Sequence, residues 1–134
     1  CILAEKLLHD EEGKIPADYK MHCFNGKLVF SQVDLDRATD HKRNLYDREW
    51  NFIPCTWGNH ANGPQVPKPI SYETMVQIAE KLSEDFTYAR IDLYSIGKKV
   101  YFGEITFYPA SGNEAFKPHE YDAKFGEMLT LPVL

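Results

Sequence analysis

The sequence lacks the features that define several classes of protein. Its three cysteines form no CxxC pair, and its five histidines show neither HxxxH nor His–Cys spacing, so we expect no structural zinc site. No apolar run approaches the roughly 20 residues that span a bilayer, and no signal peptide is visible. These absences predict a reduced, cytoplasmic protein without a membrane span.

Positive charge is also scarce. Fifteen Lys and Arg residues stand against 20 Asp and Glu, which gives a net charge of -5. General binders of nucleic acid or anionic membranes rely on basic patches, so we expect no nucleic-acid partner. A hydrophobic content of 43% argues against disorder, and 134 residues suffice for one domain with its own core. Because the chain begins at Cys1 rather than at a methionine, we expect a piece of a longer protein.

The pattern of apolar residues predicts an α+β fold. Asn25-Gly26 lies between two strand-like runs and is typical of a tight hairpin turn. Ser71 can cap a helix whose apolar residues recur at helical spacing. Strands joined by hairpins, with helices set apart, indicate an antiparallel sheet with two main helices packed on one side. The expected strands cover residues 2–8, 19–24, 27–33, 88–94 and 100–108, and the expected helices cover residues 71–84 and 118–129.

Two segments show little periodicity. Residues 34–43 are highly charged, and we expect them to form a solvated connection. Residues 44–69 contain two Trp, four Pro and two Gly, which predicts a long ordered loop with one short strand near Leu45-Tyr46. A loop of this length in a compact domain is usually functional or belongs to a binding surface.

The hairpin over residues 88–108 carries a charged face. Alternation places Arg90 and Asp92 on the side opposite the apolar residues of the first strand. Glu104 and Thr106 share one face of the second strand, and a short turn around Gly97 pairs even-numbered positions with each other. Neighbouring carboxylates repel, so we expect an offsetting cation. Arg90 can supply it in a surface ion-pair network, or Mg²⁺ can do so, since it favours one or two carboxylates plus substrate phosphates.

The same hairpin resembles a known family. The run "YARIDLYSIGKKVYFGEITFYPASG" is similar to the end of the ATP-grasp fold, which closes with R-x-D on one strand and E-x-N on the next. The run "ILAEKLLHDEEGKIPADYKMHCFNGKLVF" resembles its hinge strand, followed by an acidic and a basic position. Several motifs in this order resemble the TupA-like branch, associated with teichuronopeptide and other surface-polysaccharide biosynthesis. The resemblance covers essentially all 134 residues and implies one domain, 1–134, the C-terminal half of an ATP-grasp module.

ATP and Mg²⁺ are the cofactors that the resemblance implies. The matched hinge, which holds adenine in ATP-grasp enzymes, consists of Glu5, Lys6, Leu7 and Leu8. The acidic position that accepts hydrogen bonds from the ribose matches Asp18. Because the intervening loop has an unusual length, three other acids remain alternatives: Asp10, Glu11 and Glu12.

The resemblance also implies roles for the charged face. Lys20 matches a basic position near the phosphates, and Arg90 would contact the transferring phosphoryl group. Asp92 and Glu104 would be magnesium ligands. Thr106 stands where most ATP-grasp enzymes have Asn. A hydroxyl is a weaker metal ligand than an amide carbonyl, so the resemblance implies a weakened site for a second Mg²⁺ at this position.

The acceptor side is implied by the turn after the second strand. Ser111 and Gly112 resemble a turn whose backbone N–H groups can stabilise an oxyanion of the substrate. The expected reaction is ATP-dependent ligation of a sugar or amino-acid carboxylate to an amine. The expected partner is an N-terminal ATP-grasp subdomain that supplies another lysine and a Gly-rich loop.

Two other functions remain open from the sequence. A non-catalytic carbohydrate-binding module would use aromatic residues of the long loop to stack on sugars, unless they simply pack that loop onto the sheet. These residues are Trp50, Trp57, His60 and Tyr72. A glycosyltransferase-related domain would use the D-x-D spacing of Asp34-Leu35-Asp36, which is a weak motif in a charged segment.

Overall fold

The turn at Asn25 and Gly26 forms the first hairpin of the computed structural model, which describes residues 2, 4–35 and 39–132. Both residues have positive φ, +49° and +75°, as a two-residue type I′ turn requires. The turn joins β1 (Asp18–Phe24) to β2 (Lys27–Leu35). The predicted hairpin is confirmed, and its second strand extends two residues beyond the expected end.

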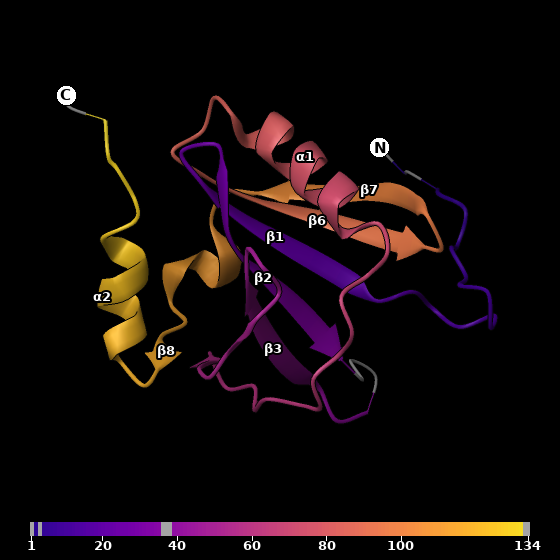
Figure 1. Cartoon of the computed structure of the whole chain (residues 1–134), viewed down its shortest axis with the longest axis horizontal. Coiled ribbons are helices and arrows are strands. Elements are labelled where there is room, and N and C mark those ends of the chain that lie inside the picture. The colour runs from indigo at the N-terminus through magenta and orange to yellow at the C-terminus, as the bar shows by residue number, and fades with distance from the viewer. Residues whose placement is uncertain (1, 3, 36–38, 133–134) are drawn as a thin grey trace.

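This hairpin lies in the middle of a six-stranded antiparallel sheet with the order β4-β3-β2-β1-β6-β7 (Figure 1). A small second sheet pairs β5 with β8. The predicted α+β class is therefore confirmed. The bounds of the remaining strands are Lys42–Asp47 for β3, Phe52–Ile53 for β4, Thr56–Trp57 for β5, Tyr88–Ile96 for β6, Lys99–Thr106 for β7 and Phe116–Lys117 for β8.

Helix α1 (Tyr72–Ser83) lies across one face of the sheet, in front of β1 and β6 in Figure 1. Its apolar stripe, which includes Met75 and Ala79, is buried against odd-numbered residues of β1 and β6 such as Met21. Ser71 precedes the helix as predicted, but it makes no side-chain capping bond. Its hydroxyl is hydrogen-bonded to that of Ser95 at 2.7 Å instead.

Helix α2 (Glu120–Gly126) is shorter than the predicted helix over residues 118–129 and lies beside β8 (Figure 1). Phe125 of α2 packs against Phe30 of β2 with ring centroids 4.7 Å apart. Phe30 pairs with His22, an even-numbered residue of β1, so α2 covers the face opposite to α1. The two helices are thus divided between the faces of the sheet, whereas the sequence predicted both on one side.

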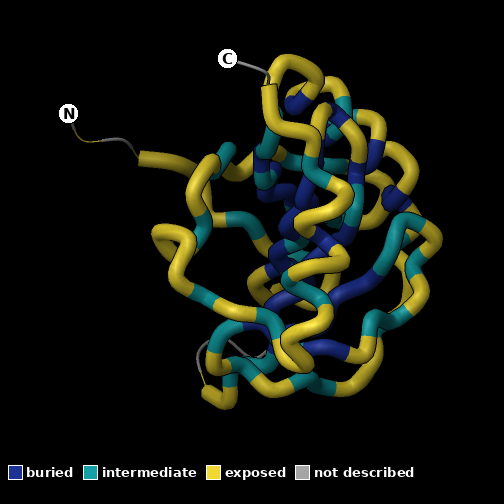
Figure 2. The backbone as a smooth tube through the Cα atoms, turned by 90° about the vertical axis from the view of Figure 1, so that its left-hand side faces the viewer, coloured by how far each residue is buried: buried dark blue, intermediate teal, exposed yellow. Residues whose placement is uncertain are grey.

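Two predicted segments differ from the structure. The strand expected over residues 2–8 is wrong, because the described part of this segment, residues 2 and 4–8, contains no strand, and Figure 2 shows it as largely exposed. The solvated connection expected over 34–43 is also wrong at both ends. Asp34 lies in β2 and Arg43 in β3, and both are buried because they form an ion pair with each other.

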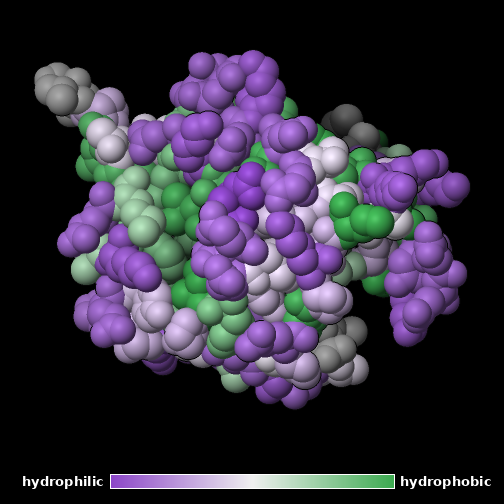
Figure 3. Space-filling view, in the orientation of Figure 1, coloured by the Kyte–Doolittle hydropathy of each residue, from purple (hydrophilic) through white to green (hydrophobic). Residues whose placement is uncertain are grey.

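Some apolar surface remains exposed. Phe86, Phe107 and Leu131 line a groove of about 550 Å³ near the C-terminal end of the described chain. Figure 3 shows green apolar surface on this side of the molecule, between areas of hydrophilic side chains. No helix of the described residues is long and apolar enough to cross a membrane.

Candidate functional site

The charged site is built on the sheet face that α1 does not cover. Strand alternation places Asp18 and Lys20 of β1 on this face, together with Arg90 and Asp92 of β6. The register pairs Lys20 directly with Asp92. Residues 72 positions apart in the sequence therefore become neighbours because β1 and β6 are adjacent strands.

A bulge brings β7 to the same place. Near the turn at Gly97 the strands pair odd with even positions, such as Ser95 with Val100, which differs from the predicted even–even pairing. The register shifts between Ile91 and Leu93, and beyond it Arg90 pairs with Thr106. The extra residue lies on β7 at Gly103, where an added Cβ would be 3.1 Å from the backbone oxygen of Asp92. The predicted proximity of Asp92 and Glu104 is therefore confirmed, although its cause is a bulge.

A chain of ion pairs connects these side chains. Nζ of Lys20 lies 2.5 Å from Oδ2 of Asp18 and 2.6 Å from Oδ2 of Asp92. Nε of Arg90 donates to Oδ1 of Asp92 at 2.6 Å, and its Nη2 donates to Oδ2 of Asp92 and to Oε1 of Glu104, both at 2.8 Å. Asp18, Lys20 and Asp92 are buried, whereas the Glu104 side chain is 62% exposed.

Arg90 is held permanently charged by this arrangement. Burial by itself lowers the pKa of Arg90, but hydrogen bonds and the charge of Asp92, together with the charge of Glu104, outweigh burial and raise the pKa above its ordinary value. Thr106 donates its hydroxyl to Oε1 of Glu104 at 3.0 Å. The threonine therefore orients the Glu104 carboxylate on the same face.

A cavity of about 500 Å³ opens beside these ion pairs. Its lining includes the apolar residues Leu7 and Phe102, whose exposed fractions are 63% and 57%. It also includes the charged residues Lys20, Asp92 and Glu104. The cavity thus brings together the predicted hinge and the predicted charged residues. Its lining includes Glu5, Lys6, Leu7, Leu8, Asp18, Lys20, Asp92 and Glu104.

Comparison with known families agrees with this geometry. Residues 1–130 match the family described as TupA-like ATPgrasp. The chain belongs to the TupA-like ATP-grasp family. It therefore contains an ATP-dependent, ligase-like domain. No curated protein and no solved structure matches the chain.

Magnesium is the metal that ATP-grasp proteins generally use, and the donors on this face fit it in part. The described residues contain no group of three or more His, Cys, Asp or Glu able to hold a metal ion by themselves. Asp92 and Glu104 nevertheless approach the same nitrogen of Arg90, and Glu104 is exposed to the cavity. Two convergent carboxylates suit an ion that takes its other ligands from nucleotide phosphates and water.

The predicted acceptor turn lies farther along the chain of this TupA-like protein. Ser111 and Gly112 belong to a short 3₁₀ segment, Pro109–Gly112, and are exposed with φ of +54° and +72°. A second, smaller charged cavity of about 220 Å³ shares Lys20 and Glu104 with the first. Neither Ser111 nor Gly112 lines either cavity, whereas Pro109 and Ala110 line the smaller one. The structure thus places the turn next to the site, but Ser111 and Gly112 are not part of the site's lining.

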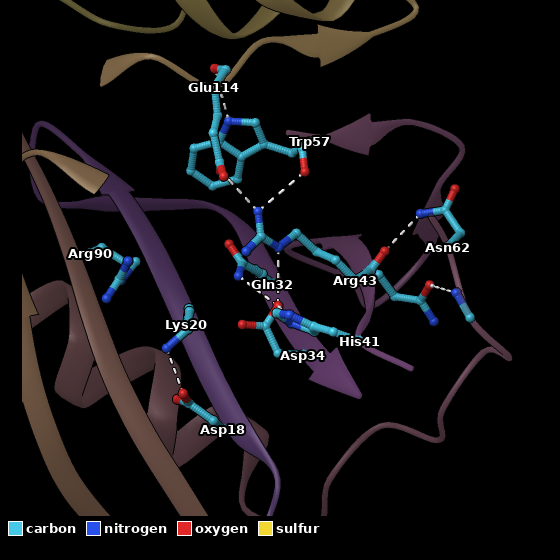
Figure 4. A network of polar contacts seen from close by, with 12 residues as sticks. Asp18, Lys20, Gln32, Asp34, His41, Arg43, Trp57, Asn62, Arg90 and Glu114 are labelled. Carbon is cyan, nitrogen blue, oxygen red and sulfur yellow. Dashed lines mark hydrogen bonds and ion pairs between the residues drawn. The ribbon is translucent and has the colours of Figure 1, made fainter. Parts of the chain in front are cut away.

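A second ion network, which the motifs do not include, lies on the same face (Figure 4). Nε of Arg43 lies 3.1 Å from Oδ1 of Asp34, and Nη1 lies 3.0 Å from Oε2 of Glu114. Nη1 also donates to the backbone oxygen of Trp57 at 3.2 Å, and Nε2 of Gln32 donates to Asp34 at 2.9 Å. Burial alone raises the pKa of Asp34, but Arg43 and these hydrogen bonds outweigh it and lower the pKa below its ordinary value.

His22 contacts both apolar and polar side chains on this face. It is fully buried, stacks on Phe30 with centroids 4.3 Å apart, and has Nδ1 2.8 Å from the Tyr88 hydroxyl. Nε2 lies 3.3 Å from Oε1 of Gln32. Burial, reinforced by the charge of Arg90, holds the pKa of His22 well below its ordinary value. The imidazole is therefore neutral and serves as a hydrogen-bonding part of the core.

The aromatic loop residues pack internally rather than forming an open platform. Trp50 stacks on Tyr46 with centroids 4.4 Å apart and an interplanar angle of 3°. Trp57 is buried and stacks on Phe116, and Tyr72 is fully buried. This packing favours the structural interpretation of these aromatics over sugar stacking. Asp34 of the D-x-D spacing is held by Arg43, and Asp36 lies outside the described residues.

Proposed function

We propose that the cavity of about 500 Å³ beside Lys20 and Asp92 binds ATP together with Mg²⁺, and that the protein uses it to activate a carboxylate for ligation to an amine. The observation that carries this proposal is that exposed apolar side chains and charged side chains line one cavity. Leu7 and Phe102 offer exposed apolar surface for a flat base, and Lys20 lines the same cavity.

The residues of this chain would act mainly by positioning charge. Lys20 and Arg90 would hold phosphate oxygens, and Asp18 would accept hydrogen bonds from the ribose. Phosphoryl transfer needs alignment and charge neutralisation more than a covalent protein intermediate. This requirement agrees with a site made of cations and carboxylates on rigid strands.

The proposed metal ligands are Asp92 and Glu104, with Thr106 orienting Glu104. Mg²⁺, when bound, would neutralise phosphate charge. The two carboxylates already share one guanidinium, so an incoming polyphosphate would meet negative charge at Glu104 unless a cation accompanied it. Nucleotide binding should therefore depend on magnesium.

The proposed chemistry has two balanced steps. A substrate carboxylate oxygen bonds to the γ-phosphorus of ATP while the bond to the ADP oxygen breaks, which gives an acyl phosphate. The nitrogen of an amine then bonds to the acyl carbon, phosphate leaves, and the amine loses a proton to solvent. The family's association with surface-polysaccharide biosynthesis suggests a sugar or amino-acid carboxylate as substrate.

We further propose that an N-terminal ATP-grasp subdomain covers this nucleotide cavity. Leu7 and Phe102 are more exposed than apolar residues of a closed nucleotide site would be. A covering partner would remove this apolar surface from water and supply further contacts to the phosphates. The chain of residues 1–134 alone should accordingly bind nucleotide weakly.

Calorimetric titration of the complete protein with a non-hydrolysable ATP analogue tests the proposal. We expect binding that requires Mg²⁺ and that falls in the Glu104→Gln variant. The exposed Glu49→Gln variant serves as a matched control and should bind as the unmodified protein does. Nucleotide binding that ignores both magnesium and Glu104 would contradict the proposed site.

A further inference from the structure

The apolar groove near the C-terminal end of the described chain has no part in the proposed function. Its volume is about 550 Å³, and none of its described lining residues lines either charged cavity. Figure 1 shows the C-terminal segment and the N-terminal segment on opposite sides of the molecule, and the N-terminal segment is the one that contributes to the nucleotide cavity. The apolar groove is therefore a separate surface, whose occupation would leave the nucleotide cavity open.

Four large apolar side chains of this groove are exposed to solvent. Tyr108 is 83% exposed and Leu131 is 68% exposed, and Phe86 and Phe107 are exposed to a lesser extent. Together these side chains expose about 500 Å² of surface, which is near the upper end for the largest apolar patch of a typical monomer. The same area is more than half of the roughly 800 Å² that each partner buries in a standard interface.

The walls of the apolar groove are held together by contacts within the chain. Nδ2 of Asn25 donates to the backbone oxygen of Thr130 at 2.8 Å, and the backbone nitrogen of Thr130 donates to Oδ1 of Asn25 at 3.0 Å. The backbone nitrogen of Asn25 also donates to the oxygen of Thr87 at 2.8 Å. Phe86 and Phe107 pack with ring centroids 4.8 Å apart. The surface is thus formed before a partner arrives, which lowers the entropic cost of binding.

The absence of charge in this groove indicates which partner it fits. Among the described residues that line it, none is charged, although 26% of the chain is Asp, Glu, Lys or Arg. A different protein is commonly selected by complementary charges, and this groove offers none. At a two-fold axis, by contrast, a residue meets its own copy, so charged side chains there would repel each other. An uncharged surface suits contact between two copies of this chain, which each carry a net charge of -5.

The shape of the surface fits the same partner. Tyr108 lines the apolar groove and is its most exposed large apolar side chain. In a two-fold arrangement Tyr108 of each copy can enter the groove of the other, so that both grooves are filled at once. Such a contact uses the same patch on both copies and closes at two subunits, whereas a head-to-tail contact would leave one groove empty and could continue.

We propose that the apolar groove is the contact surface of a symmetric dimer of this protein, in which Tyr108 of each copy packs into the groove of the other. The dimer removes the exposed side chains of Phe86, Phe107 and Leu131 from water as well. It does not depend on the proposed function, because the groove and the nucleotide cavity share no described lining residue.

Sedimentation equilibrium of the complete protein at concentrations from about 1 to about 100 µM tests the proposal. We expect a reversible equilibrium between monomer and dimer. The dimer should persist or become stronger when NaCl is raised from about 0.1 to about 1 M, because salt screens the repulsion between two negatively charged copies and does not weaken an apolar contact.

Two variants locate the contact. Tyr108→Glu and Leu131→Glu each place a charge at the proposed interface, and we expect each to raise the dissociation constant of the dimer at least about tenfold. The matched control is Ile70→Glu, which replaces an apolar side chain that is 74% exposed and lies outside the groove. It should leave the dissociation constant unchanged. All three side chains are exposed, so the fold should be retained, and Leu131→Glu decides alone if Tyr108→Glu does not fold.

Three outcomes would overturn the proposal. The first is a monomer over the whole concentration range, which would show that a second copy does not occupy the groove. The second is a dimer that Tyr108→Glu and Leu131→Glu leave as stable as Ile70→Glu does, since the contact would then lie elsewhere. The third is a dimer that dissociates as salt is raised, which would indicate a charged contact. Loss of nucleotide binding would count against the proposed function alone.

Discussion

Lys20 of β1 and Asp92 of β6 lie opposite each other on neighbouring strands, with Nζ of Lys20 2.6 Å from Oδ2 of Asp92. Both side chains are buried. Buried ion pairs often add little net stability, but loss of one partner leaves a charge without compensation. The ion pair at the expected phosphate site therefore also connects two neighbouring strands of the sheet, β1 and β6.

Replacement of Lys20 by methionine tests this connection. Lys20→Met keeps most of the side-chain volume but leaves Asp18 and Asp92 without their shared cation. We expect the free energy of unfolding in urea to fall by about 3–5 kcal/mol. The control Lys27→Met removes an exposed lysine 3.4 Å from Glu80 and should change it by less than about 1 kcal/mol. Equal effects of both replacements would refute the expectation.

Removal of the carboxylate charges separates function from folding. We expect Asp92→Asn and Glu104→Gln in the complete protein each to lower ATP turnover at least about a hundredfold. Glu104 is largely exposed, so Glu104→Gln should leave the urea unfolding midpoint nearly unchanged. Asp92→Asn should also destabilise the fold, because Lys20 and Arg90 lose a buried partner. Unchanged turnover in both variants would disprove the assignment of these ligands.

Buried His22 predicts a pH dependence of stability. Its pKa in the folded protein lies well below the value of about 6.5 expected in the unfolded chain, so the unfolded state binds more protons as pH falls. Stability is fully present above about pH 6.5 and should decline by up to about 1.4 kcal/mol per pH unit below it, until the folded pKa is reached. Urea unfolding between pH 5 and 8 measures this slope.

The variant His22→Gln cannot titrate and should show a shallower slope over the same pH range. His9→Gln, which removes an exposed histidine near the N-terminus, is the matched control and should keep the slope of the unmodified protein. A His22→Gln variant with an unaltered slope would show that another group causes the pH dependence.

The bulge at Gly103 offers a test of the backbone that positions Glu104. An alanine Cβ would lie 3.1 Å from the backbone oxygen of Asp92 and 3.2 Å from the Tyr94 ring. We expect Gly103→Ala to lower the free energy of unfolding by about 1–3 kcal/mol and to weaken magnesium-dependent nucleotide binding, because the strands must separate. Gly126→Ala, at an unobstructed position of α2, should be neutral or slightly stabilising.

Local signals in the sequence were sufficient for several elements. Asn25-Gly26 predicted its hairpin because few residues adopt positive φ at two successive positions. The helical spacing of Met75 and Ala79 predicted α1, since that spacing creates one apolar face to bury. The predicted hinge, by contrast, is not a strand in residues 2 and 4–8, although it lines the expected cavity. Apolar residues alone do not provide a strand partner.

The charged segment after β2 shows where local reasoning failed. Asp34 and Arg43 were expected in solvent because isolated charges are costly to bury. They are buried because strand pairing places them directly opposite each other. Glu114, which completes their network, lies 71 residues from Arg43 in the sequence. No periodicity or motif relates these positions, so the smaller cavity could not be predicted.

The sequence by itself determined the antiparallel sheet, the hairpins, the helix α1 and the face that carries Arg90 and Asp92, because alternation and turn chemistry act between near neighbours. Only the tertiary structure decided which charges meet. The adjacency of β1 and β6 gives Lys20 its contact with Asp92, and the bulge in β7 turns Glu104 toward Arg90. Ion pairs act over a few ångströms in space, and their partners are therefore set by the arrangement of strands rather than by distance along the chain.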